Sequence, residues 1–240
     1  MKLFKKAILV IHGFSGSLAD NEMLVNQLET NNSFDVYAWT LPAHEKYVIN
    51  KVKYHDWVES VDKQMTFLLS HGYRKIYVVG HSMGGVLATY LGARYKQIKK
   101  IVLLSPAFNY LSFNQYKQDI KDFSIIKDEY SSYGNFFHKM MKIPFPTMLQ
   151  FTKLVKEYRD YIKDIKQEVL VLHGTKDELV PYETIDYIKE NIGSKNTFYT
   201  TINNGRHVLL RGEKKEELIK YIEAFLIGGR KWKQMKKSEF

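Results

Sequence analysis

Short apolar segments alternate with longer helical patterns along most of the chain, and this alternation restricts the possible folds more than any other feature. The apolar segments are rich in Val, Ile, Leu and aromatic residues, and they lie at 7–11, 34–42, 75–80, 98–106, 168–174 and 197–202. Apolar residues at helical spacing indicate helices over 18–28, 55–71, 83–96, 182–192 and 213–227. Continuously apolar strands separated by helices are typical of a parallel sheet that is covered on both faces. We therefore predict an α/β fold with a mainly parallel central sheet flanked by helices.

Residues 107–166 interrupt this alternation. The segment is rich in Tyr, Phe and Met, has a helical pattern, and contains the sequence IPFP at 143–146. Insertions that follow the carboxyl end of a strand in a parallel sheet lie over the ligand crevice. We predict a core formed by residues 1–106 and 167–240, with 107–166 as a small helical lid (cap) insertion. The alternative is that these helices only extend the core.

The chain contains no cysteine, which excludes disulfides, a thiolate nucleophile and Cys-ligated metals. This composition fits a reducing compartment. The amino end, MKLFKKAILVIHGF, has a basic start and an apolar run, but the run is too short for a signal peptide and no small-residue cleavage site follows. No other segment approaches the length of a membrane span. We expect a soluble, cytoplasmic protein without a transmembrane segment.

The formal net charge is +10, from 36 Lys and Arg against 26 Asp and Glu. The basic residues are dispersed among acidic ones, except in the tail RKWKQMKK at 230–237. No nucleic-acid-binding motif accompanies them. We therefore expect a Lys-rich solvated surface without a specific nucleic-acid partner, and a tail that attracts polyanions only weakly.

A serine between two glycines follows directly after the third apolar segment, in the sequence IYVVGHSMGG. The pattern G-x-S-x-G between a strand and a helix is that of the nucleophile elbow in α/β-hydrolases. There the serine stands on a tight turn above the sheet, which Gly80 and Gly84 permit because they have no Cβ to collide with neighbouring chain. The N-terminus of the following helix favours negative charge at this place. The pattern also occurs by chance, so the assignment of Ser82 depends on finding its partners.

A serine nucleophile needs a general base and a carboxylate that orients the base, and in this fold the chain order is Ser, acid, His. Three histidines follow Ser82, namely His138, His173 and His207. His138 belongs to the predicted lid, and His173 lies in the last turn of a strand, which favours a packing role. His207 is in the loop NNGRH between the last predicted strand and helix, from where a side chain can reach the serine. We predict His207 as the base.

Asp177 is the predicted acid because the sequence HGTKDELVP places it just after the fifth strand. Glu178 is adjacent but would point in another direction, and Asp186 lies within a helix. The loop after the fourth strand, SPA, contains no carboxylate. A solvated turn residue is the alternative interpretation of Asp177.

An oxyanion hole requires two backbone N–H groups near the reacting carbonyl. One comes from the residue after the nucleophile, which here is Met83. The second is expected from the loop after the first strand, where IHGFSG supplies Phe14 and Gly13 lets the loop turn. A simple strand end is the alternative interpretation of the His-Gly pair.

Together, IHGFSGS, GHSMGG, HGTKDELVP, GRHVLL and the last helix resemble the α/β-hydrolase superfamily, in particular small bacterial carboxylesterases related to monoacylglycerol lipases. The resemblance covers nearly the whole chain, including the size and position of the lid insertion. It implies a triad of Ser82, Asp177 and His207, with Phe14 and Met83 as oxyanion donors. The chain departs from it after the second strand, where relatives often have a G-H-G turn and this sequence has LPAHEK.

The resemblance implies a serine carboxylic-ester hydrolase that cleaves short- to medium-chain acyl esters, monoacylglycerols among them, through an acyl-enzyme on Ser82. It implies no metal or organic cofactor, and a small-molecule ester as partner. The same triad serves thioesterases, acyltransferases and C–C hydrolases, and a binding protein on the same scaffold is the non-enzymatic alternative. One substrate-binding candidate is Gly13, in the loop that supplies Phe14. The others are apolar lid residues suited to an acyl pocket, for which ordinary packing is the alternative: Phe136, Phe137, Met140, Met141, Phe145 and Met148.

Overall fold

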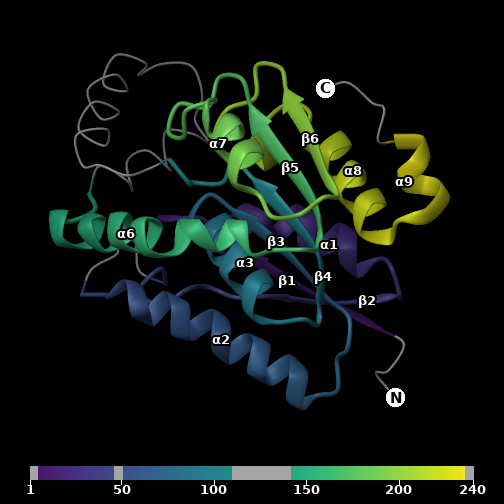
Figure 1. Cartoon of the computed structure of the whole chain (residues 1–240), viewed down its shortest axis with the longest axis horizontal. Helices are drawn as coiled ribbons and strands as arrows, with labels where there is room; N and C mark the ends of the chain where they lie inside the picture. The colour runs from purple at the N-terminus through teal and green to yellow at the C-terminus, as the bar shows by residue number, and fades with distance from the viewer. Residues whose placement is uncertain (1–4, 46–50, 110–141, 236–240) are drawn as a thin grey trace.

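The computed structural model describes residues 5–45, 51–109 and 142–235, and it contains a parallel six-stranded sheet in the order β2-β1-β3-β4-β5-β6 (Figure 1). Every predicted strand is present, and the largest difference is in β2, which ends at Ala38. The predicted α/β fold is therefore confirmed. The strands are β1 Lys6–Ile11, β2 Phe34–Ala38, β3 Ile76–His81, β4 Ile98–Leu104, β5 Glu168–Gly174 and β6 Thr197–Ile202.

The strand order reverses at β1, whose neighbours are β2 on one side and β3 on the other. In an open parallel sheet such a reversal leaves a crevice at the carboxyl ends of the two strands, because the connections that follow them lead to opposite sides. The loops after β1 and β3 both begin at this crevice. They carry Phe14 and Ser82 of the predicted site.

Helices cover both faces of the sheet (Figure 1). The first layer consists of α1 Glu22–Glu29, α8 Lys215–Ile227 and α9 Gly229–Met235. The second layer consists of α2 Tyr54–Ser70, α3 Met83–Arg94, α6 Phe145–Tyr158 and α7 Thr184–Asn191. Short 3-10 helices within the connections are η2 Leu18–Asn21, η3 Arg159–Lys163 and η4 Leu209–Arg211.

The inner strands β1 and β3 are apolar on both sides because each side meets a helical layer. Along β1, Leu9 and Ile11 belong to the core cluster of the second layer, while Ile8 and Val10 belong to that of the first layer. All four side chains are at most 1% exposed. Burial of one such side chain contributes about 2 kcal/mol to folding, which is why the sequence shows continuous apolar runs here.

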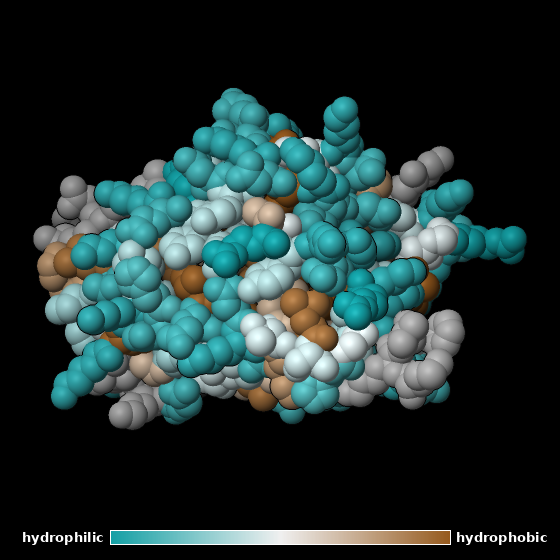
Figure 2. Space-filling model, turned by 60° about the horizontal axis from the view of Figure 1, so that its bottom comes forward, coloured by the Kyte–Doolittle hydropathy of each residue, from teal (hydrophilic) through white to brown (hydrophobic). Residues whose placement is uncertain are grey.

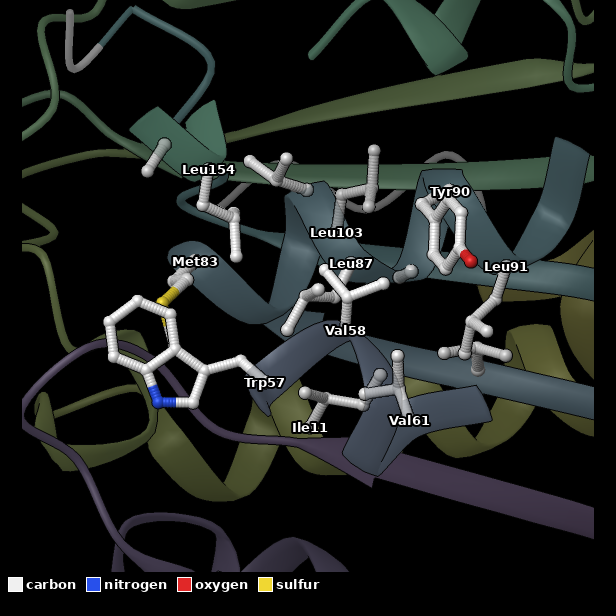
Figure 3. Packing of buried hydrophobic residues seen from close by; sticks show 14 of the residues in the cluster. Ile11, Trp57, Val58, Val61, Met83, Leu87, Tyr90, Leu91, Leu103 and Leu154 are labelled. Carbon is white, nitrogen blue, oxygen red and sulfur yellow. The ribbon is translucent and has the colours of Figure 1, made fainter. Parts of the chain in front are cut away.

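The described end of the predicted lid segment packs into the main core. Leu154 of α6 is fully buried in the cluster that also contains Trp57 of α2 and Met83 of α3 (Figure 3). The helix α6 therefore belongs to the layer that covers this face of the sheet. Residues 110–141 of the segment lie outside the described residues.

The basic tail begins with a helix, α9, that the sequence analysis did not predict. Gly228 ends α8 and Gly229 begins α9, with φ angles of 78° and 66° that glycine adopts without strain. The chain then turns into α9, whose Trp232 is 6% exposed. The indole meets three aromatic rings of β6 and α8 at centroid distances of 5.1–5.2 Å. One tryptophan thus anchors a short basic helix to the first layer.

The face of the molecule in Figure 2 is largely hydrophilic, with small and separated hydrophobic areas. Isolated apolar groups of this kind are usual on the surface of folded proteins. Among the helices of residues 5–45, 51–109 and 142–235, none combines the length and the apolar character that crossing a bilayer requires.

Candidate active site

Ser82 lies on the tight turn between β3 and α3 and has a strained backbone. Its φ of 54° and ψ of −115° are rarely adopted by residues with a Cβ. Hydrogen bonds of 2.9 Å hold the turn, from Ser82 N–H to Leu104 O and from Gly85 N–H to Ser82 O. Strain of this kind costs about 1–3 kcal/mol and persists only where the surrounding structure enforces it. This backbone geometry is that of a nucleophile elbow.

Two glycines permit the elbow because the chain passes itself at very short range. A Cβ on Gly80 would lie 2.2 Å from the carbonyl oxygen of Gly84, and a Cβ on Gly84 would lie 2.3 Å from that of Ile11. Real Cβ atoms essentially never approach other atoms within 3.0 Å. The close approach predicted at these two positions is confirmed. It also places the end of β1 directly against the start of α3.

The loop after β1 lies beside Ser82, since a Cβ on Gly13 would be 3.0 Å from Ser82 Cβ. Within the part of the chain that the structure describes, the backbone N–H groups of Phe14 and Met83 donate to no protein acceptor. Both residues are nevertheless at most 6% exposed. Buried N–H groups without an acceptor are rare in folded proteins. The N–H groups of Phe14, in the loop after β1, and of Met83, the first residue of α3, are thus available to bind an oxygen atom of a ligand.

Packing holds the two residues that carry these N–H groups. The Phe14 ring stacks on Phe151 of α6, with centroids 4.7 Å apart and planes 10° apart. It also meets Trp57 of α2 edge-on at 5.7 Å. Met83 belongs to the same buried cluster as Trp57 (Figure 3). The backbone around both N–H groups is therefore supported by the second helical layer.

His12 connects the loop after β1 to the loop after β2. Its Nδ1–H donates to Gly13 O at 2.8 Å, and its Nε2 accepts from Leu41 N–H at 2.9 Å. A neutral imidazole satisfies both bonds, and burial lowers the pKa of His12.

The loop LPAHEK, which contains Leu41, departs from the G-H-G turn of relatives. Its Ala43 has a left-handed φ of 66°. This turn thus forms without the glycines of a G-H-G sequence.

Asp177 and His207 meet although they come from different loops. His207 Nδ1–H donates to the two carboxylate oxygens, at 2.9 and 3.0 Å. The Asp177 side chain is fully buried, and its Oδ1 also accepts from the N–H groups of Leu179 and Val180 at 3.0 and 2.9 Å. The carboxylate is fixed by its own turn and in turn places the His207 proton on Nδ1. In the neutral imidazole, Nε2 is then the basic nitrogen.

Asp177 stays ionised in this environment. Burial acts to raise the pKa of Asp177, but the neighbouring His207 and His173 and the bond from the Val180 N–H outweigh burial and lower the pKa to about 2. His173 Nε2 lies 3.5 Å from the carboxylate and donates to Val180 O at 3.1 Å. Burial lowers the pKa of His173 itself. Burial thus favours the neutral form of His173, which packs against the acid.

The His207 loop also lies against the elbow. The carbonyl oxygen of His207 accepts a hydrogen bond from His81 Nε2–H at 3.1 Å, and the two imidazole rings have centroids 5.0 Å apart. His81 directly precedes Ser82 in the chain. The structure thus brings the three loops that carry Ser82, Asp177 and His207 together at the carboxyl edge of the sheet.

The predicted pocket residues are placed only in part. At the start of α6, Phe145 is 49% exposed, whereas Met148 is 1% exposed within the core cluster. The other lid candidates lie outside the described residues: Phe136, Phe137, Met140 and Met141.

The sequence analysis missed residues that join the loops around the site. Glu178 accepts a hydrogen bond of 3.1 Å from His207 N–H, and Asp20 of η2 forms an ion pair with Arg211 of η4. The only sequence signal for Asp20 was its helix-capping position, which predicts a local bond to the Ser17 N–H. Nothing in the sequence indicated the partners across the loops.

The reversal of strand order at β1, the elbow serine and the Asp–His pair together define an α/β-hydrolase. Solved structures share the fold. A structure reported for the metagenome-derived lipolytic enzymes LipS and LipT has a TM-score of 0.75 and 17% identity, covering 94% of this chain and 95% of that chain. A monoacylglycerol lipase of Paleococcus ferrophilus has a TM-score of 0.71 and 18% identity, covering 92% and 93%.

The family described as serine aminopeptidase, S33, matches residues 4–215, and the chain belongs to this family. A carboxylesterase of Bacillus subtilis is 23% identical over 248 residues, which cover 92% of each chain. A thermostable monoacylglycerol lipase of Bacillus sp. is 23% identical over 217 residues, covering 84% of this chain and 82% of the relative. The predicted resemblance to small esterases and lipases is confirmed, and the protein is a lipase-like serine hydrolase.

Proposed function

We propose that the protein hydrolyses carboxylic esters through an acyl-enzyme on Ser82, with His207 as general base and Asp177 as its orienting acid. The observation that carries the proposal is the double contact of His207. Its ring bonds to a buried, ionised carboxylate, and its main chain bonds to the residue that precedes the elbow serine. An imidazole held by a carboxylate, on a loop bonded to the turn of a strained serine, supports the activation of that hydroxyl as nucleophile.

In the acylation step, His207 Nε2 takes the proton of Ser82 Oγ while Oγ attacks the ester carbonyl carbon. Asp177 keeps the imidazole in the required tautomer and stabilises the imidazolium that forms. The N–H groups of Phe14 and Met83 bind the oxyanion of the tetrahedral intermediate, and one such donor contributes about 3 kcal/mol. The bond to the alcohol oxygen then breaks, and that oxygen takes the proton from Nε2.

In the deacylation step, a water molecule gives a proton to His207 Nε2 and attacks the acyl carbon. The second oxyanion binds to the same two N–H groups. The bond from the acyl carbon to Ser82 Oγ breaks, Oγ recovers the proton, and the carboxylic acid leaves. Both half-reactions use the same protein groups, and the ester and one water molecule are the reactants.

We assign the substrate class as short- to medium-chain acyl esters, including monoacylglycerols. Phe151 stacks on Phe14 and so places an apolar helix beside the oxyanion loop. Phe145 and Met148 belong to the same helix, and the missing Cβ of Gly13 lets the oxyanion loop lie directly against Ser82. The names of two relatives, a carboxylesterase and a monoacylglycerol lipase, support this class.

The proposal is tested with nitrophenyl esters from acetyl to palmitoyl, together with monoacylglycerols and acyl-CoA. We expect the highest kcat/KM for short or medium acyl esters and a loss of ~10⁴-fold or more in Ser82→Ala. Equal activity in Ser82→Ala would overturn the assignment of the nucleophile. A strong preference for acyl-CoA would replace the esterase assignment with a thioesterase.

A further inference from the structure

The main chain of His207 is held on both sides of its Cα atom by two side chains, one from the loop after β5 and one from the end of β3. Its N–H donates to Glu178 Oε2, and its C=O accepts from His81 Nε2–H, each at 3.1 Å. Neither bond involves the His207 ring. The two bonds fix the point from which the His207 side chain starts, while the bonds to Asp177 fix the rotation of the ring.

Glu178 uses both carboxylate oxygens in this contact. Oε2 accepts from His207 N–H, and Oε1 lies 3.4 Å from Nε of Arg206, the residue before His207. The Glu178 side chain is only 14% exposed, which strengthens a charge-assisted hydrogen bond. Because Glu178 directly follows Asp177, one turn holds His207 by its ring and by its main chain.

His81 approaches the same residue from the elbow. Its side chain is buried between the loops after β1 and β6, and its Nδ1 would be 3.1 Å from a Cβ on Gly13. A carbonyl oxygen can only accept, so His81 Nε2 carries the hydrogen. Burial lowers the pKa of His81, so the ring is neutral at ordinary pH. His81 then adds no positive charge beside His207 when His207 takes a proton.

We propose that Glu178 and His81 are positioning residues that clamp the main chain of His207, and so hold its imidazole where it can take the proton of Ser82. The loop NNGRH is also held at Gly205, whose C=O accepts from Lys176 N–H at 2.9 Å, and the clamp adds two bonds at His207 itself. A displacement of about 1 Å in a reacting group costs ~10²-fold in rate. The catalytic part of this inference rests on the proposed function, whereas the two contacts do not.

The kinetic test compares Glu178→Ala and His81→Leu with Glu178→Gln and His81→Gln. We expect kcat for nitrophenyl butyrate to fall ~10- to 100-fold in the first two variants, with KM changed less than ~2-fold. The Gln variants should recover most of kcat, because the Gln carbonyl accepts from His207 N–H and the Gln amide donates to His207 C=O. Glu183→Ala is the matched control, since Glu183 is an exposed acidic residue of the same segment.

Hydrogen exchange and NMR test the contacts independently of activity. Glu178→Ala should speed exchange of the His207 amide ~10-fold or more relative to wild type, and should broaden the His207 Nδ1–H resonance. Glu183→Ala should change neither. Thermal unfolding shows whether each variant is folded, and the Gln variants supply the comparison if Glu178→Ala or His81→Leu does not fold.

Two results would overturn the clamp. Unchanged exchange of the His207 amide in folded Glu178→Ala would show that the bond does not hold the loop. Altered exchange with kcat at the wild-type level in both Glu178→Ala and His81→Leu would show that the contacts do not serve catalysis. Full activity in Ser82→Ala is a different result, because it would refute the proposed function while the exchange data still decide whether the clamp exists.

Discussion

The carboxylate of Asp177 meets the imidazole of His207 with both oxygens, at 2.9 and 3.0 Å from Nδ1, at the point where the loops after β5 and β6 come together. This contact links the stability of the fold to the chemistry of the site. Ionisation leaves both oxygens of the buried carboxylate free to accept, from the imidazole and from the N–H groups of its own turn. Its titration therefore has measurable consequences.

Acid should destabilise the protein through Asp177. The pKa of Asp177 is lowered from an ordinary value of 3.8 to about 2, so the ionised group stabilises the fold fully above about pH 4, and this contribution is lost as the pH falls towards 2. This contribution to the free energy of unfolding is about 2 kcal/mol. Urea unfolding between pH 2 and pH 6 should show a shallower acid dependence for Asp177→Asn than for wild type. Parallel pH dependences of the unfolding free energy in the variant and the wild type would contradict this account. The same variant should also lose ~10⁴-fold in kcat, because His207 would adopt the wrong tautomer.

A methyl group on Gly84 should prevent the elbow from forming. A Cβ there would lie 2.3 Å from Ile11 O, so β1 and α3 would have to separate. We expect Gly84→Ala to cost ~3 kcal/mol or more. Gly72→Ala is the matched control, because Gly72 has φ +84° but no atom within 4 Å of its Cβ position, and it should cost only about 1 kcal/mol. Denaturant unfolding measures the free energy of unfolding of both variants. Equal losses in this free energy would show that the space at Gly84 is not limiting.

His12 should stabilise the loop that carries Phe14. In His12→Leu, Gly13 O and Leu41 N–H lose their partner, and we expect a loss of about 3 kcal/mol in unfolding free energy. We also expect a lower kcat from a less rigid oxyanion loop. His55→Leu, on the exposed side of α2, should change stability by less than about 0.5 kcal/mol. A His12 variant as stable and active as this control would refute the role of the bridge.

The helix α6 should behave as part of the core. Leu154 is fully buried, so Leu154→Ala should lower the unfolding free energy by about 3 kcal/mol. Lys153 is its exposed neighbour on the same helix, and Lys153→Ala should be neutral. Chemical denaturation measures both. A neutral Leu154→Ala would indicate that α6 can detach from the sheet at little cost.

Local patterns were sufficient to predict the strands, most helices and the elbow glycines. The inner strands, such as β1 and β3, are buried on two sides, which produces continuous apolar runs, and the tight approaches at the elbow leave glycines in the sequence. The pairing of Asp177 with His207 followed from the known chain order of such sites. These features depend on residues near in sequence or on the fold class alone.

Other features depend on how loops meet in space, and the sequence did not indicate them. Glu178 reaches the His207 main chain only because the loops after β5 and β6 lie side by side, as the 2.9 Å bond from Lys176 N–H to Gly205 O shows. The stacking of Phe14 on Phe151 requires α6 to pack on the sheet. The sequence did not predict α9, because a glycine pair indicates the end of a helix but not the start of another one.

Covalent labelling with a fluorophosphonate tests the central claim most directly, because only a hydroxyl activated by a neighbouring base reacts readily. Mass spectrometry of digested wild-type protein should find the phosphonyl group on the peptide that contains Ser82, and His207→Ala should remain unlabelled under the same conditions. Ester hydrolysis by folded protein whose Ser82 stays unmodified, or equal labelling of the His207 variant, would contradict the account.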